Sequence, residues 1–230
     1  MSRFLTSFNL RAYLMNRFPY RAALVGFADV EELVPNEYTE LPHGISIGIR
    51  LSDQIVNNLI SGPTPLYAYH YHVVNHYLND LAIKVMNYLQ RDGHAALPIP
   101  ASLTIDFKQH RGHLSHKMVA TRAGLGWIGK SALLVTNTFG PRVRFVTVLT
   151  DAPLRMGNPI LESQCGDCRN CVKACPVGAI KGVNWSVKSN RADLLDVDRC
   201  AEFIEQNRAE VGAPVCGVCI QACPKGLKQS

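Results

Sequence analysis

The sequence has no cysteine before Cys165, and none of its apolar runs approaches the 18 or more residues of a membrane-spanning helix. The N-terminus lacks the pattern of a secretory signal peptide. Eight cysteines in 230 residues are too few for a small disulfide-stabilised protein, and a chain of this length can bury a core without such bridges. We therefore expect a soluble, cytoplasmic protein without a membrane partner.

Neither sign of charge dominates the chain. There are 24 Lys and Arg against 18 Asp and Glu, which gives a formal net charge of +6. The excess is spread over the parts before and after Cys165, which argues against a dedicated nucleic-acid-binding tail.

Hydrophobic periodicity predicts a layered α+β domain over residues 1–160, and an iron–sulfur module over residues 161–230. An amphipathic helix is expected within the first 20 or so residues. Further on, the pattern predicts strands at 22–28, 44–51 and 95–99, helices at 53–61, 69–92 and 113–123, and a strand pair at 131–136 and 142–150 joined by a turn at 137–141.

The cysteines form a repeated motif. Cys165, Cys168, Cys171 and Cys175-Pro176 follow the C-x2-C-x2-C-x3-C-P pattern of bacterial two-cluster ferredoxins. A second run, Cys216-x2-Cys219-x3-Cys223-Pro224, lacks its first cysteine, and Cys200 is the only cysteine left to replace it.

In two-cluster ferredoxins the fourth cysteine of each run binds the other cluster. The sequence therefore predicts two [4Fe–4S] clusters, one held by Cys165, Cys168, Cys171 and Cys223, the other by Cys175, Cys200, Cys216 and Cys219. The alternative is a pair of structural zinc sites, although zinc needs neither the third close cysteine nor the Cys-Pro ends.

The segment Gly124–Ser131 (GLGWIGKS) matches both a phosphate-binding P-loop and a dinucleotide fingerprint. Both require a strand before the loop and a helix after it, whereas here the order is reversed. We expect a loop that approaches a large cofactor or serves only for close packing; an iron–sulfur ATPase is the least favoured alternative.

Together with the cysteine pattern, the stretches Val25–Ala28, Tyr71-His72, Ala123–Leu134 and Asp151–Leu154 give the chain a resemblance to epoxyqueuosine reductases, which are cobalamin- and iron–sulfur-dependent and similar in their core to reductive dehalogenases. The resemblance implies a nitroreductase-like α+β domain that binds a corrinoid, followed by the ferredoxin module. It places Gly129, Lys130, Ser131, Thr136, Arg144 and His72 around the corrinoid, with Lys130 or Arg144 pairing with its phosphate or amide oxygens.

The family's proton-donating aspartate would fall at His110 in this sequence. His110 is therefore the predicted catalytic residue, with His113 and His116 as alternatives, because imidazole titrates near neutrality. By this resemblance we expect a short form of the family, without the helical-repeat domain that many members carry after the ferredoxin module.

The predicted function is a reductase in which the clusters pass electrons from a ferredoxin- or flavodoxin-type donor to cobalamin. The substrate would be epoxyqueuosine in tRNA or a small electrophile. The alternative is an electron-transfer protein without a substrate of its own.

Overall fold

The computed structural model describes Leu10, Ala12 and residues 23–227, so most of the helix expected near the N-terminus lies outside the described residues. The chain forms two compact units. The first contains the described residues up to Arg50, Asn75–Leu125 and Arg144–Ile160; the second contains Leu51–Val74, Gly126–Val143 and the described residues from Leu161. The last passage from the first unit to the second falls between Ile160 and Leu161. Two earlier segments also group with the second unit, so neither unit is continuous in sequence.

The first unit is built on a four-stranded sheet with the strand order β1-β2-β6-β3. Its strands are β1 (Ala23–Asp29), β2 (His43–Arg50), β6 (Val143–Thr150) and β3 (Ala96–Ile99). β1 pairs antiparallel with β2, and β3 pairs antiparallel with β6. The central strands β2 and β6 are buried along nearly continuous runs, which is typical of a sheet covered on both faces.

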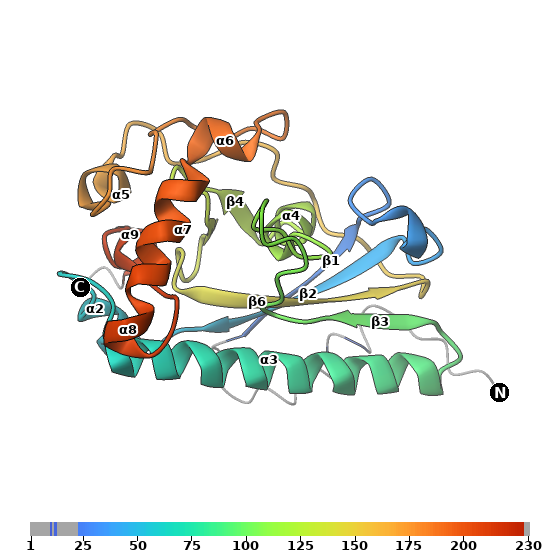
Figure 1. Ribbon diagram of the computed structural model, residues 1–230. Coiled ribbons are helices and arrows are strands. Elements are labelled where there is room, and N and C mark those ends of the chain that lie inside the picture. The colour runs from blue at the N-terminus through green and yellow to red at the C-terminus, as the bar shows by residue number, and fades with distance from the viewer. Residues whose placement is uncertain (1–9, 11, 13–22, 228–230) are drawn as a thin grey trace. The chain divides into compact units, whose positions relative to one another are not determined.

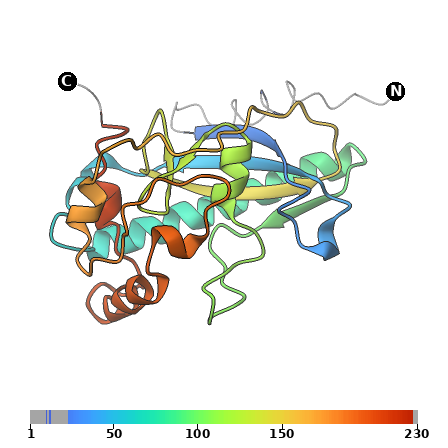
Figure 2. The same ribbon diagram turned by 90° about the horizontal axis from the view of Figure 1, so that it is seen from above.

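Helices cover the two faces of this sheet. α3 (Pro65–Arg91) runs along one face, and the part of it in the first unit buries a stripe with helical spacing, Leu78, Leu81, Val85 and Leu89. α4 (His116–Arg122) packs against β1 and β2, and Figures 1 and 2 show it on the face opposite α3.

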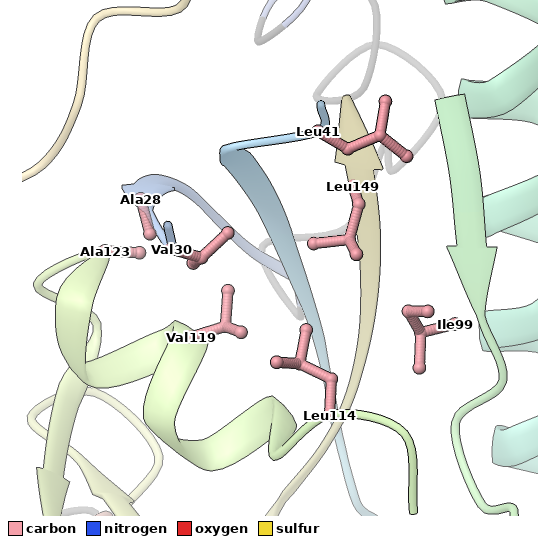
Figure 3. Close-up of a cluster of buried hydrophobic side chains, with 8 residues drawn as sticks. All are labelled: Ala28, Val30, Leu41, Ile99, Leu114, Val119, Ala123 and Leu149. Carbon is pink, nitrogen blue, oxygen red and sulfur yellow. The ribbon is translucent and has the colours of Figure 1, made fainter. Parts of the chain in front are cut away.

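The core between α4 and the sheet is drawn in Figure 3. Its buried side chains come from β1, β3, β6, α4 and the adjoining loops: Ala28, Val30, Leu41, Ile99, Leu114, Val119, Ala123 and Leu149. Since the cluster joins residues up to 121 positions apart in the chain, it fixes α4 and the segment before it onto the sheet.

Most of the predicted elements are present, with shifted ends. The long helix begins at Pro65 rather than residue 69, the helix predicted at 53–61 is α2 (Asp53–Asn57), and η1 (Asn36–Tyr38) is an additional short 3-10 helix. α4 begins at His116 rather than residue 113 because the Ser115 hydroxyl caps it, accepting a hydrogen bond from the Met118 amide at 3.5 Å.

The predicted pairing of residues 131–136 with 142–150 is wrong. In the second unit, β4 (Gly126–Ile128) pairs antiparallel with β5 (Leu134–Thr136), whereas β6 belongs to the four-stranded sheet. β4 and β5 are joined by a tight turn, in which the Gly129 amide donates to the Leu133 carbonyl at 2.8 Å. A second turn follows β5, in which the Thr136 hydroxyl donates to the Gly140 carbonyl at 3.1 Å and accepts from the Phe139 amide at 3.0 Å. β5 therefore forms a hairpin with β4, and β6 lies between β2 and β3 in the four-stranded sheet.

The second unit also contains five short helices after residue 161: α5 (Asn170–Ala174), α6 (Arg191–Leu194), α7 (Val197–Gln206), α8 (Arg208–Val211) and α9 (Val218–Gln221). α9 contacts both α5 and α2, and α7 contacts α8. In the described part of the chain, no helix is both long and apolar enough to cross a membrane.

Candidate metal centre

The first cysteine run reaches Cys223 through helix packing. Cys165 and Cys168 lie in the loop before α5, Cys171 lies within α5, and Cys223 follows α9, which contacts α5. The pKa of Cys171 is raised to about 11, mainly by burial and in smaller part by the charges of Cys165, Cys223 and Cys168. The four sulfurs are therefore electrostatic neighbours.

The other four cysteines form a second group. Cys175 ends α5, Cys200 lies in α7, Cys216 precedes α9 and Cys219 lies within it. Burial raises the pKa of Cys200, followed by the charges of Cys216 and Cys175. Burial also raises the pKa of Cys219, which is affected by these three cysteines and by Cys171 of the first group. The two groups are thus neighbours within the second unit.

Backbone amides point at sulfurs of both groups. The Ala179 amide donates to Cys175 Sγ at 3.3 Å. Backbone hydrogen bonds at Val218 and Lys225 lower the pKa of Cys216 and Cys223, respectively, although burial raises both pKa values overall. Hydrogen bonds of this kind stabilise thiolates and are one of the factors that set cluster potentials.

All eight cysteines are free thiols rather than disulfides. Gathering thiols in fours, most of them partly shielded from water, makes their ionisation unfavourable, and bound iron offsets this penalty because it supplies the compensating positive charge. Among the described residues, no three His, Cys, Asp or Glu side chains converge closely enough to hold a single metal ion. In a cubane, however, each cysteine binds a different iron. The donor set fits two [4Fe–4S] clusters.

The end of the glycine-rich segment, Gly129–Ser131, lies against the first cysteine group within the second unit. A Cβ atom on Gly129 would stand 2.7 Å from Val135 Cγ2 and 3.4 Å from Cys165 Sγ, so the residue leaves room for a close approach to that sulfur. The Lys130 ammonium donates to the Gly166 carbonyl at 2.6 Å and to the Cys168 carbonyl at 3.1 Å. Ser131, next in the chain, is buried.

This segment does not have the surroundings of a nucleotide-binding loop. Gly126–Ile128 is itself strand β4, and the first regular element after Ser131 is β5 rather than a helix. A P-loop depends on a helix N-terminus facing the phosphate. The local structure therefore contradicts the ATPase alternative.

The other residues predicted to contact the corrinoid belong to both units: His72 and Thr136 to the second, and Arg144 to the first. His72 is exposed on α3 in the second unit, where its ring meets that of Tyr71 edge to face with centroids 5.8 Å apart. The Thr136 hydroxyl closes the turn after β5 by donating to the Gly140 carbonyl. Arg144, in the first unit, donates from Nε to Asn75 Oδ1 at 3.1 Å and from Nη2 to the Ala101 carbonyl at 3.5 Å.

The three candidate histidines lie in or beside the loop between β3 and α4. His110 is exposed and has a φ of 51°, the left-handed conformation, at the end of a turn in which Asp106 bridges to Arg111. The ring of His113 packs edge to face against Tyr38. Figure 2 shows the loop, in green, projecting beyond the sheet.

His116 has a different environment. Its Nε2 donates to the Pro100 carbonyl at 2.9 Å, so its Nδ1 accepts from the Thr147 hydroxyl at 2.8 Å. Burial lowers the pKa of His116 to about 4; the hydrogen bond to Pro100 opposes this shift and the charge of Arg144 adds to it. The ring is therefore neutral at physiological pH, with both nitrogens engaged.

Sequence reasoning missed two buried side chains of the second unit. Arg142 is only 1% exposed; its Nη1 donates to Asn57 Oδ1 at 2.8 Å and lies 3.5 Å from Asp53 Oδ1. Trp127 is fully buried, and its indole Nε1 has no hydrogen-bond partner among the described residues, so a bound group could use this donor. No sequence motif distinguishes either residue from an ordinary core or surface position.

Comparison with known proteins first defines the class. Residues 164–226 match the family of 4Fe-4S double cluster binding domains. The fold is similar to that of a catabolic reductive dehalogenase, with a TM-score of 0.69 and 19% identity over 90% of this chain and 30% of the other. These matches confirm the predicted fold class, an α+β domain combined with a double-cluster module.

The predicted resemblance to epoxyqueuosine reductases is also confirmed. The enzyme of that name from Bacillus anthracis is 33% identical over 124 residues, which is 50% of this chain and 30% of the relative. An epoxyqueuosine reductase structure described with a modified tRNA stem loop matches with a TM-score of 0.61 and 17% identity, over 97% of this chain and 67% of the other. The matched region is thus about a third of the length of the curated relative.

Proposed function

We propose that the protein is an iron–sulfur reductase of the epoxyqueuosine reductase type, in which two [4Fe–4S] clusters deliver electrons to a base-off cobalamin that reduces an electrophile. The observation that carries this proposal is the arrangement of all eight cysteines as two neighbouring groups of four. The likeness to epoxyqueuosine reductases and the fold shared with a reductive dehalogenase support the rest of it.

In this proposal the ligands of one cluster are Cys165, Cys168, Cys171 and Cys223, and those of the other are Cys175, Cys200, Cys216 and Cys219. The electrostatic neighbours of Cys171 and Cys200 support this division. When bound, the clusters supply one-electron transfer. The polypeptide holds the thiolates in place and directs backbone amides at them.

A bound corrinoid would supply a strongly reducing cobalt centre. We propose that its contacts come from His72 and the backbone of Gly129–Ser131. The side chains of Lys130, Thr136 and Arg144 hydrogen-bond to protein groups, so in this proposal they brace the segments that face the corrinoid instead of pairing with its phosphate.

His110 remains the proposed proton donor. Its exposure in a projecting loop supports this role, because a general acid must reach the proton acceptor of the substrate. The neighbouring side chains Leu103, Ile105 and Phe107 are 48%, 49% and 78% exposed, which gives the loop an apolar surface beside the imidazole. The substrate would be epoxyqueuosine in tRNA or another electrophile.

The proposed partner is an electron donor of the ferredoxin or flavodoxin type. We place the protein in the cytoplasm, because reduced thiols persist in that compartment. The related structure with a tRNA stem loop supports tRNA as the macromolecular substrate.

Cobalamin binding is the test that separates this proposal from the electron-carrier alternative. Adding cobalamin to the anaerobically purified, iron-loaded protein should change the corrinoid absorption spectrum. At a concentration 100 times the Kd it should stabilise the fold by about 2.7 kcal/mol. His72→Ala should weaken the binding, whereas His94→Ala, on the first unit, serves as the matched control. Unchanged spectra and melting temperatures at saturating cobalamin would favour a protein that only transfers electrons.

A further inference from the structure

Lys130 is a buried cation held by backbone carbonyls. Its residue is 4% exposed, and its ammonium donates to the carbonyls of Gly166 and Cys168, which lie on either side of Asp167 in the first cysteine loop. The Asn184 side chain donates to the same Gly166 carbonyl at 3.3 Å. Carbonyl oxygens satisfy the hydrogen bonds of an ammonium but carry only partial charge. A buried full charge is stabilised by a nearby anion, and a cluster with four thiolates is one.

Arg142 places a second buried cation near the same group. Arg142 lies two residues after Gly140, whose backbone packs against the carbonyl of Lys225, two residues after Cys223. Asp53, whose side chain is 39% exposed, offsets part of the Arg142 charge at 3.5 Å. Lys130 is the cation in direct contact with the first cysteine loop, through its hydrogen bonds to the Gly166 and Cys168 carbonyls.

The second cysteine group has weaker and opposed charges around it. Among the described residues, Lys130 and Arg142 are the only buried lysine or arginine side chains, and the charged residues Arg191 and Asp196, which precede α7 and its Cys200, are both exposed. Arg191 is exposed, so water and salt screen it more than they screen a buried charge. Backbone N–H groups point at sulfurs of both groups and do not distinguish them. The buried positive charge is thus concentrated beside the first group.

We propose that Lys130, assisted by Arg142, positions the first cysteine loop and makes the cluster of Cys165, Cys168, Cys171 and Cys223 the more easily reduced of the two. This inference rests on the proposed cluster assignment. Reduction adds one electron from the ferredoxin- or flavodoxin-type donor, which loses one electron; no bond or proton is exchanged. A cubane with four thiolates changes from about two to about three negative charges, and a buried cation stabilises the more negative form.

The test is an anaerobic redox titration followed by electron paramagnetic resonance. At a fixed solution potential, Lys130→Met should lower the ratio of reduced to oxidised first cluster at least tenfold, which corresponds to about 59 mV for one electron. The other cluster should shift less. Lys130→Arg retains the charge and should restore the wild-type ratio. Lys188→Met removes an exposed lysine of the same unit and should change neither cluster. Cys200→Ala, which removes a ligand of the other set, identifies the two signals.

Iron content separates failure of this inference from failure of the proposed function. Wild-type protein with four or fewer irons would overturn the two-cluster assignment itself. Lys130→Met with about eight irons and wild-type potentials would overturn only the role of Lys130. If Lys130→Met does not load iron, Lys130→Gln provides the same test, because its amide can donate to carbonyls without carrying a charge. A ratio within threefold of wild type in that variant would also refute the inference.

Discussion

The environment of His116 makes a quantitative prediction about pH. The ring is neutral in the folded protein, since burial lowers its pKa to about 4 and its two nitrogens are engaged by the Pro100 carbonyl and the Thr147 hydroxyl. In the unfolded chain a histidine titrates near 6.5. Below that pH the unfolded state binds a proton that the folded state does not accept, and the stability of the fold falls accordingly.

The size of the effect follows from the two pKa values. The contribution of His116 is fully present above about pH 7 and is lost as the pH falls from about 6.5 to about 4. One pKa unit corresponds to about 1.36 kcal/mol, so the loss reaches about 2 kcal/mol at pH 5 and about 3 kcal/mol at pH 4. Replacing the ring by glutamine removes this titration.

Anaerobic urea unfolding of the iron-loaded protein at about pH 7 and about pH 5 measures the effect. Between these values, wild type should lose about 2 kcal/mol more stability than His116→Gln. His76→Gln, which replaces an exposed histidine of α3, should behave as wild type. Acid sensitivity of the clusters is common to all three proteins and cancels in the comparison. Equal losses in wild type and His116→Gln would refute the reasoning.

Three further predictions concern the cysteines, the glycine-rich segment and the proton donor. Cys200→Ala should reduce the iron content from about eight to about four per chain, and retention of about eight would contradict the assignment of this cysteine. Gly126→Ala would push a Cβ atom into the Val135 carbonyl oxygen on the paired strand. It should therefore lower the free energy of unfolding, measured with heat or urea, by about 1–3 kcal/mol or more. An unchanged free energy of unfolding would mean that the β4–β5 pairing is wrong. His110→Ala should lower turnover of the epoxide by about 100-fold or more, whereas His110→Asp should retain much of it; full activity in the alanine variant would remove His110 from the mechanism.

The sequence by itself predicted the parts of the protein that depend on local spacing. The period of Leu78, Leu81, Val85 and Leu89 predicted a long helix, and alternating or continuous apolar runs predicted β1, β2 and β3. The spacing of the cysteines predicted a double-cluster module, because two-residue intervals allow consecutive thiolates to wrap one cubane. These signals are carried by residues close together in the chain.

The pairing of β5 was not predictable in this way. Residues 131–136 have the composition of a strand, but strand propensity does not select a partner. In the fold, β5 pairs with β4 in a two-stranded sheet, and the turn closed by Thr136 follows it. Local sequence patterns also do not show which distant segments pack together. The sequence therefore suggested two continuous domains, whereas each compact unit is made of three separate segments of the chain.

The surroundings of Lys130 are likewise set only by the tertiary structure. In the sequence, Gly129-Lys130-Ser131 matched a phosphate-binding motif and, by resemblance, a corrinoid contact. In the fold, the lysine reaches Gly166, 36 residues further along the chain, and is buried beside the first cysteine group. A charge acts through its distance to other charges and through its burial, and both are properties of the folded chain. The sequence determined which metal chemistry this protein can support, whereas the tertiary structure determined which of its cysteine groups the buried cations adjoin.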